Sequence, residues 1–293
     1  MIGTDTDKIR ITTFTDPMMG LSYECEPIFR KLETHLGDNI EFKYCMSLLV
    51  EDVSNFMNQS EVALPPKEGI ALYNKRLATI YKSEEYITGM PIIMDDFRLF
   101  DEKHRSTLPF NLAFKTVEIV APEKSNEFLY RLRYATIVDT LPTTHYDEIL
   151  KVIDSLVIDK PMFEEVYTNG QASHALDKDL EITKELGIHS LPAYLIEYKN
   201  KSLLINQLIG YDDFVRLIGE LSEGSIKPQV PNFSMEYLET LIKRRGLISD
   251  VEIKYVFSSV NEQLIDNMIT ALRAKAEYVV YPVAESYFIR LNH

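Results

Sequence analysis

The chain has 293 residues, of which 45% are hydrophobic and 26% charged, and its formal net charge is −14 with a sequence pI near 5.0. That composition is typical of a globular protein with room for one large domain and a smaller one. The negative charge argues against non-specific binding to nucleic acid or to anionic membranes, because both repel an acidic surface.

Neither a membrane span nor an export signal is predicted. No apolar run approaches the ~20 residues of a membrane helix, and the polar N-terminal segment, residues 1–8, lacks the apolar core of a signal peptide. The two cysteines, Cys25 and Cys45, do not suggest a disulfide framework. We therefore expect a cytoplasmic protein with no membrane partner.

The first elements in the chain are a strand, a helix and a second strand. Apolar and polar side chains alternate over 9–14, which predicts a strand. A helix is predicted over 26–36, residues 37–39 end it, and a second strand follows over 40–46. Such a unit favours a right-handed crossover and parallel strands.

The middle of the chain is predicted to be helical. Residues 52–66 form an irregular connection, and apolar residues then recur at helical spacing from about 67 to 165. A strand pattern returns at 191–196, which favours an insertion into one sheet over a separate helical domain. A strand over 203–205 is predicted to pair with it as a hairpin, and a helix with an acidic first turn opens at 210.

A linker by composition, residues 222–232, precedes a small C-terminal unit over 233–293. Helices are predicted after the capping residues Ser234, Ser249 and Asn261, and a terminal hairpin follows. Three helices and a hairpin are typical of a winged helix.

The predicted third helix of this unit carries no Lys or Arg in its first turns, unlike a helix that reads a DNA groove. The basic cluster Lys243-Arg244-Arg245 is explained as well by the end of a helix. The unit is therefore interpreted as a protein-binding or intramolecular module, and no nucleic acid partner is expected.

The turn between the first strand and the first helix carries the most specific motif. It reads Asp16-Pro17-Met18-Met19-Gly20-Leu21-Ser22-Tyr23 and continues to Glu26-Pro27. This stretch resembles the active-site turn of the DsbA/FrnE branch of thioredoxin-like proteins, which reads Asp-Pro-x-Cys-x-x-Cys-Tyr/Trp followed by Glu-Pro. Met19 stands in the place of the nucleophilic cysteine and Ser22 in that of the resolving cysteine.

The resemblance implies an α/β fold of the thioredoxin-like, DsbA type over residues 1–224, with a large helical insertion. Residues 187–192 match the loop before the third core strand of this family. By that match, Pro192 is expected to follow a cis peptide bond and to face the active-site turn.

The motif lacks the groups that disulfide exchange requires. That reaction needs a thiolate to attack and a second sulfur to resolve the mixed disulfide, so classical disulfide oxidoreductase activity is not expected. Cys25 is interpreted either as a relocated reactive thiol at a helix N-terminus or as a small buried residue, and the second interpretation is favoured. Cys45 is predicted to be a core residue.

A second resemblance concerns Ser22. Kappa-class glutathione transferases and chromene-carboxylate isomerases share this fold and have Ser-x-x-Ser at the turn, where the first serine hydrogen-bonds the glutathione sulfur. Met19 replaces that serine here. Glutathione therefore remains an open cofactor, with Ser22 and Cys25 as the candidate catalytic residues.

The whole layout is similar to protease adaptors of the YjbH/SpxH type, which combine a DsbA-like domain, a helical insertion and a small winged-helix-like part. The first hypothesis is thus a non-redox protein that binds a protein or peptide partner, as a protease adaptor or regulator. The predicted binding groove is formed by Met19, Gly20, Leu21, Ser22, Tyr23, His189, Leu191 and Pro192.

Two alternatives stay open. One is a thiol- or glutathione-dependent oxidoreductase, transferase or isomerase that uses Ser22 or Cys25. The other is a regulator that binds DNA through the C-terminal unit. His189 is interpreted either as a contact to a bound peptide or thiol or as a solvent-facing loop residue.

No metal site is predicted, because no histidine has ligand spacing to a cysteine or to another histidine. The six histidines are His35, His104, His145, His174, His189 and His293.

Overall fold

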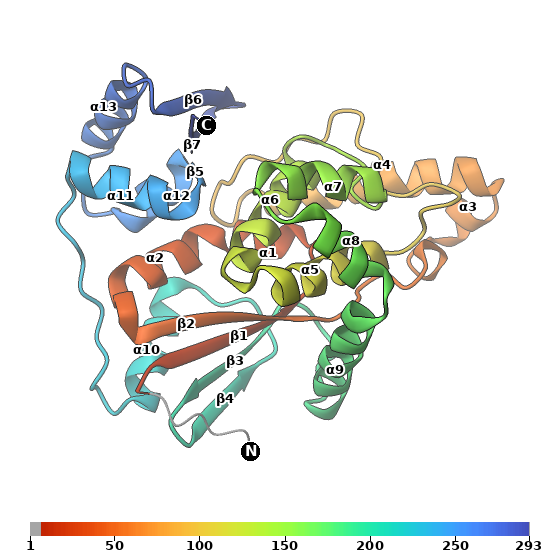
Figure 1. Ribbon diagram of the computed structural model, residues 1–293, viewed down its shortest axis with the longest axis horizontal. Coiled ribbons are helices and arrows are strands. Elements are labelled where there is room, and N and C mark those ends of the chain that lie inside the picture. The colour runs from red at the N-terminus through yellow and green to blue at the C-terminus, as the bar shows by residue number, and fades with distance from the viewer. Residues whose placement is uncertain (1–6, 293) are drawn as a thin grey trace.

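The first of two β-sheets has four strands in the order β2-β1-β3-β4 (Figure 1). The computed structural model describes residues 7–292, so His293 and most of the N-terminal segment 1–8 lie outside the described residues. β1 runs parallel to β2, as predicted, and antiparallel to β3, which forms the predicted hairpin with β4. The strands are β1 (Ile9–Thr15), β2 (Ile40–Met46), β3 (Ala193–Tyr198) and β4 (Lys201–Ile205).

Two helices pack on one face of this sheet, α2 (Glu26–Leu36) and α10 (Tyr211–Leu221). Their apolar sides meet the sheet in an aromatic cluster, in which the Phe29 ring lies 5.9 Å from both Tyr194 and Phe214. α2 begins and ends where the sequence predicts. A short additional helix, α1 (Gly20–Glu24), lies in the segment that is predicted to be a turn.

The insertion between β2 and β3 is mostly helical, and α9 packs along β2 on the other side of the sheet. In the described part of the chain, no helix is both long and apolar enough to cross a bilayer. The elements of the insertion are η2 (Val53–Asn55), α3 (Gln59–Val62), α4 (Pro66–Glu84), α5 (Leu108–Val120), η3 (Pro122–Lys124), α6 (Ser125–Ile137), α7 (Tyr146–Ser155), α8 (Lys160–Thr168) and α9 (Gln171–Glu185).

The predicted helical range of 67–165 is wrong at two places. Residues 85–107 form no helix, because Gly89 and Asp96 adopt positive φ and Pro91 has no N–H to donate. Its apolar side chains Met90, Ile92, Phe97, Leu99 and Phe100 are nevertheless buried in the core, and Ile93 N donates to Ile137 O at 3.0 Å. Helices also continue past residue 165, through α8 and α9.

The C-terminal unit contains the three predicted helices and the predicted hairpin. Ser234 and Ser249 cap helices as expected, accepting hydrogen bonds from Tyr237 N and Glu252 N at 3.1 and 3.0 Å. A short strand that was not predicted, β5, completes a second sheet in the order β5-β7-β6. The elements are α11 (Met235–Arg245), β5 (Leu247–Ser249), α12 (Asp250–Val256), α13 (Glu262–Leu272), β6 (Tyr278–Val283) and β7 (Ser286–Leu291).

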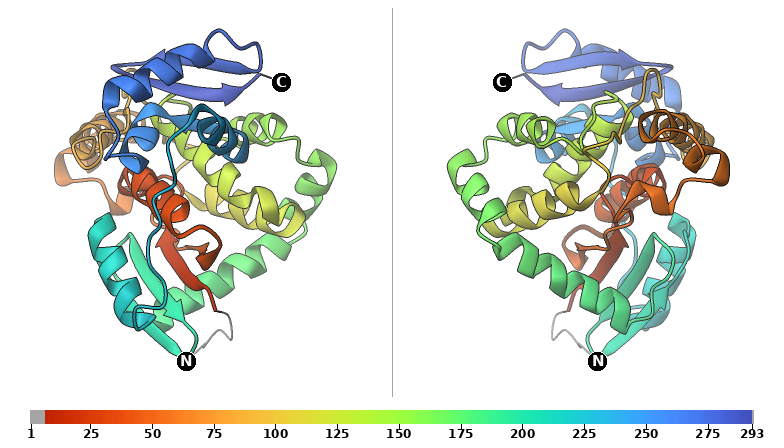
Figure 2. Two further views of the ribbon diagram at one scale, coloured as in Figure 1. Left: turned by 90° about the vertical axis from the view of Figure 1, so that its left-hand side faces the viewer. Right: turned by 90° about the vertical axis from the view of Figure 1, so that its right-hand side faces the viewer.

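This unit packs on the rest of the molecule, with α12 along α2 and the small sheet against the helical insertion (Figures 1 and 2). Phe288 of β7 is fully buried and its ring lies 4.8 Å from that of Tyr134 on α6. Leu247 joins the same core cluster. One face of the C-terminal unit is therefore used inside the molecule.

A buried charge network joins helix α2 on the sheet, helix α6 of the insertion and helix α12 of the C-terminal unit. It consists of Glu26, Arg30, Tyr130, Arg133 and Glu252. Arg30 Nε donates to Glu252 Oε1 at 3.1 Å, and Arg133 Nη1 donates to Glu26 Oε1 at 2.9 Å. Tyr130 Oη donates to Glu252 Oε2 at 2.6 Å. All five side chains are buried, so each charge depends on its partner for compensation.

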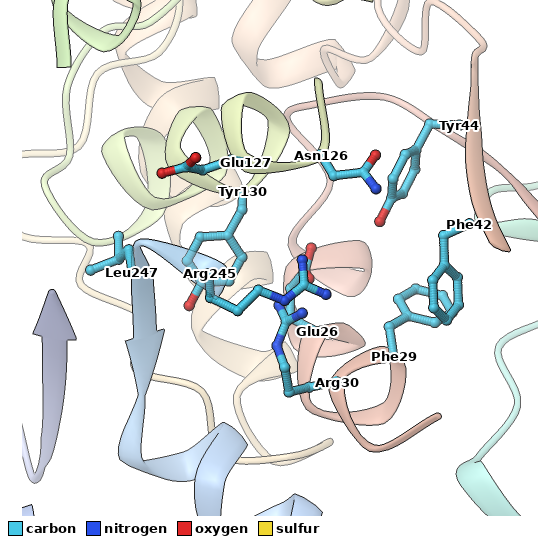
Figure 3. Close-up of a pocket in the computed structure, with 10 residues that line it drawn as sticks. All are labelled: Glu26, Phe29, Arg30, Phe42, Tyr44, Asn126, Glu127, Tyr130, Arg245 and Leu247. Atoms are coloured by element: carbon cyan, nitrogen blue, oxygen red, sulfur yellow. The ribbon is translucent and has the colours of Figure 1, made fainter. Parts of the chain in front are cut away.

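Figure 3 shows Glu26 and Arg30 of α2, Tyr130 of α6 and Arg245 of α11 directed toward one another around a small cavity of about 20 Å³. Glu33 adds a second layer to the contact, because it accepts from Arg30 Nη1 at 2.9 Å and also pairs with Arg245. Three parts of the chain thus meet at one cluster of charges.

Loss of Arg30 is expected to destabilise the fold strongly. Arg30→Ala leaves Glu252 and Glu26 buried with less compensation, and breaking such a pair costs roughly 3–5 kcal/mol. The measurement is the free energy of unfolding in urea. Arg216→Ala is the control, because Arg216 pairs with Asp213 and Glu220 on the surface of α10 and should change little. Equal losses in both variants would contradict the network's role.

Candidate functional site

The segment between β1 and α2, residues 16–25, occupies the position of the predicted active-site turn. Asp16 is fully buried there and binds two other parts of the chain. Its Oδ2 accepts from Leu49 N at 2.8 Å, Thr107 Oγ1 at 2.7 Å and Asn111 Nδ2 at 2.9 Å, while Oδ1 accepts from Met18 N at 3.0 Å. Burial raises the pKa of Asp16 despite these hydrogen bonds. The carboxylate therefore holds the segment to the start of α5.

Met19 and Ser22, in the places of the two redox cysteines, are buried at 7% and 1% exposure. Ser22 Oγ lies 2.8 Å from Thr15 Oγ1, which also accepts from Arg133 Nη2 at 3.1 Å. The Met19 sulfur lies 3.8 Å from the same Thr15 oxygen. The Ser22 hydroxyl is therefore engaged inside the protein and not presented to a ligand.

Tyr23 and Glu24 bind the non-helical segment 85–107. Tyr23 Oη donates to Pro91 O at 3.0 Å. Glu24 Oε2 accepts from both Thr88 N and Thr88 Oγ1, at 3.0 and 2.9 Å. Burial raises the pKa of Glu24 to about 7. These contacts explain why a segment without helical hydrogen bonds is held in place.

Helix α4 closes over the start of α1. Tyr81 Oη donates to Met18 O, and α1 is in contact with both α4 and α6 (Figure 1). A Cβ added at Gly20 would clash with the Glu84 carboxylate and the Tyr81 ring. Glycine is thus required at this position by the close approach of α4.

The predicted binding groove is closed in this structure. The Leu191–Pro192 peptide bond is cis, but Pro192 is buried, Leu191 is half-buried and His189 alone among the eight predicted residues is exposed. On the other side, only Leu21 is half-buried, while Met19, Gly20, Ser22 and Tyr23 are buried. Without rearrangement, an extended peptide could reach only His189 and the exposed parts of Leu21 and Leu191.

Of the two interpretations of Cys25, the structure agrees with the favoured one, a small buried residue. Cys25 lies at the N-terminus of α2 with 1% exposure, and burial raises its pKa to about 12. Its Sγ lies 3.5 Å from Tyr194 Oη. Burial raises the pKa of Cys45 to about 12 as well, and both thiols are free. The cost of desolvating a thiolate here exceeds the benefit of the helix N-terminus.

A family model described as thioredoxin matches residues 12–215, more than two thirds of the chain. The chain belongs to the thioredoxin family. A solved structure of a putative protein disulfide isomerase from Nitrosomonas europaea superposes with a TM-score of 0.60 at 16% identity, covering 74% of this chain and 99% of the other. A probable DsbA oxidoreductase from Streptomyces coelicolor gives 0.54 at 11% identity, with 77% and 94% covered. The predicted DsbA-type fold is thereby confirmed.

Two curated relatives resemble this thioredoxin-family chain over most of its length. The ClpXP adapter protein SpxH of Shouchella clausii is 23% identical over 278 residues, which is 93% of this chain and 86% of the relative. The protein of the same name from Halalkalibacterium halodurans is 21% identical over 253 residues, which is 85% and 78%. The predicted similarity to SpxH-type adaptors is confirmed.

Two features of this thioredoxin-family protein were not predicted from its sequence. The first is a cleft of about 870 Å³ beside α4, which is called the α4 cleft below. A group of metal-binding residue types, Asp101, His104 and His145, lies at its edge. His104 and His145 have no informative spacing in the sequence, so no local signal marks them. The cleft is lined by Lys67, Ile70, Ala71, Asn74, Lys75, Ala78, Met94, Asp96, Phe97, Arg98, Phe100, Asp101, Glu102, Asp139, Thr140, Leu141, Pro142 and His145.

Cys25 is expected to be unreactive in the folded protein. The rise of its pKa from 9.0 to about 12 lowers the thiolate fraction near neutral pH by ~1000-fold, and burial excludes the reagent as well. A Cys45→Ala variant isolates Cys25 for titration with an aromatic disulfide reagent, native and in denaturant. We expect one fast thiol in denaturant and a rate at least ~100-fold lower in the native protein. Comparable rates in both conditions would show an accessible thiol.

The closure by α4 is tested at Gly20. Gly20→Ala is expected to lower the free energy of unfolding by roughly 1–3 kcal/mol, since the added methyl must displace Tyr81 and Glu84. Gly219→Ala is the matched helical control, because no atom lies within 4 Å of a Cβ there. It should stabilise by about 0.5–1 kcal/mol through helix propensity. Urea unfolding of both variants gives the comparison, and a stabilising Gly20→Ala would refute the close approach of α4.

Proposed function

We propose that this chain is a non-redox thioredoxin-fold adaptor, which binds another protein and delivers it to an ATP-dependent protease of the ClpXP type. One observation carries the first half of the proposal. The segment that holds the reactive sulfurs in a Cys-x-x-Cys turn has Met19 and Ser22 instead, and both are buried in internal contacts. The similarity to two ClpXP adapters over 85% and 93% of the chain supports the second half.

The alternative of a thiol- or glutathione-dependent enzyme has less support. Such an enzyme needs a group that can contact the ligand sulfur, and Ser22 is engaged with Thr15 while Cys25 is buried with a raised pKa. Glutathione belongs to this alternative and is not part of the adaptor proposal.

The partner in this proposal is a protein and not DNA. Arg244 and Arg245, two of the three residues in the basic cluster of the C-terminal unit, pair with Glu33 of α2. Both side chains thus make a contact within the molecule, and the net charge of −14 disfavours a polyanion. Most residues of the predicted groove are buried, so a partner would reach only His189 and the half-buried Leu21 and Leu191 without rearrangement.

The proposal predicts that removing this chain lengthens the half-life of at least one protein that ClpXP degrades. Half-lives are measured across the proteome after a pulse of labelled amino acids, in cells with and without the chain, each with ClpX active or depleted. Because adaptor and protease act in one path, removing the chain should not lengthen the half-life further in cells that are already depleted of ClpX. The candidate protein is then tested with purified ClpX, ClpP and this chain.

A cysteine-free variant, Cys25→Ala with Cys45→Ala, separates adaptor from thiol enzyme. An adaptor that uses no sulfur chemistry should restore the short half-life as well as the natural chain does. The enzyme is favoured if only the natural chain restores the short half-life and if millimolar glutathione raises the melting temperature of the natural chain. If no protein changes its half-life in a ClpX-dependent way, the adaptor role is wrong.

A further inference from the structure

Asp101, His104 and His145 form a compact group of nitrogen and oxygen donors. Asp101 Oδ2 lies 3.0 Å from His104 Nδ1 and 2.9 Å from His145 Nε2. The two imidazole rings are stacked, with centroids 3.7 Å apart and an angle of 25° between their planes. One potential ligand atom from each residue lies within 4.8 Å of the others. Over residues 7–292, no other group of three such residues meets this criterion.

The backbone orients this group from two separate places in the insertion. Asp101 begins a tight turn in which its Oδ1 accepts from Lys103 N at 2.7 Å and from His104 N at 2.9 Å. This turn fixes Asp101 relative to His104. His145 is the residue immediately before α7. The three side chains are 33–46% exposed, so an ion from solvent can reach them.

We propose that Asp101, His104 and His145 bind a divalent transition-metal ion of the zinc class. Two imidazole nitrogens and one carboxylate oxygen suit Zn²⁺, whereas Mg²⁺ and Ca²⁺ prefer oxygen donors alone. The proposal does not depend on the adaptor role.

The distances fit a site that is closed by hydrogen bonds when no metal is bound. Bonds of about 2.0–2.1 Å in a tetrahedral zinc site place two ligand atoms about 3.3–3.4 Å apart. The present separations of 2.9 and 3.0 Å must therefore lengthen by a few tenths of an ångström, and the stacked rings must turn so that both lone pairs point at one ion. In the metal-bound state, the two ring nitrogens and the Asp101 oxygen that now face one another would all face the cation.

The bound ion would join the segment before α5 to the start of α7. Asp101 and His145 both line the α4 cleft, so the ion would lie at its rim. Three protein ligands leave a coordination position for water or for a side chain that enters the cleft, which is the arrangement of an open rather than a closed zinc site.

The test uses the full chain without an affinity tag, stripped by a chelator and titrated with Co²⁺ and then with Zn²⁺. Tetrahedral Co²⁺ has strong visible absorption, and Zn²⁺ displaces it. We expect one equivalent to bind. His104→Ala and His145→Ala should each weaken binding at least about tenfold, and Asp101→Asn should weaken it while keeping the shape of the side chain. His174→Ala is the control, because His174 is exposed on α9 outside the group.

Folding is checked separately by urea unfolding of each variant without metal, which should be near that of the natural chain because the three side chains are partly exposed. Zn²⁺ should raise the melting temperature of the natural chain and of His174→Ala, but not that of the double variant His104→Ala/His145→Ala. The proposal is overturned if no ion binds at one equivalent, or if the double variant binds as tightly as the natural chain.

Discussion

The molecule depends on two buried guanidinium groups that must each meet a carboxylate. Arg30 projects from α2 and Arg133 from α6, and between them they contact Glu26 and Glu252. A buried charge without its partner is costly, so α2, α6 and α12 are held in one mutual arrangement. Glu26, Arg30 and Glu33 are spaced three and four residues apart, which places them on one side of α2. A single helix thus connects the sheet, the insertion and the C-terminal unit.

The segment between β1 and α2 acts in this molecule as a structural junction. Asp16, Tyr23 and Glu24 retain strong hydrogen-bonding groups, but each is used to hold a part of the insertion. Removing the sulfurs takes away the chemistry that requires an exposed thiolate, while the same backbone geometry still brings many segments together. α4 can then lie directly on α1, where an open active site would need access to solvent.

Because the turn is buried, the surfaces that a ligand can reach lie on the outside of the insertion. The α4 cleft combines an apolar lining with acidic and basic groups at its edge, and the Asp101–His104–His145 group lies on that edge. The C-terminal unit contributes differently, since its buried face completes the core around Tyr134 and Met90. The molecule therefore has a buried, hydrogen-bonded centre and separate outer surfaces.

Short-range patterns in the sequence determined the elements and the missing chemistry. Alternation predicted β1, capping serines located α11 and α12, and the residues between Asp16 and Pro27 indicated the fold and the absence of two sulfurs. These signals act over a few residues, so they are readable without the fold. Only the tertiary structure decided the burial of the turn, the raised pKa of Cys25 and the β5 strand. Arg30 and Glu252 are 222 residues apart, and such pairs form only when every intervening element has packed.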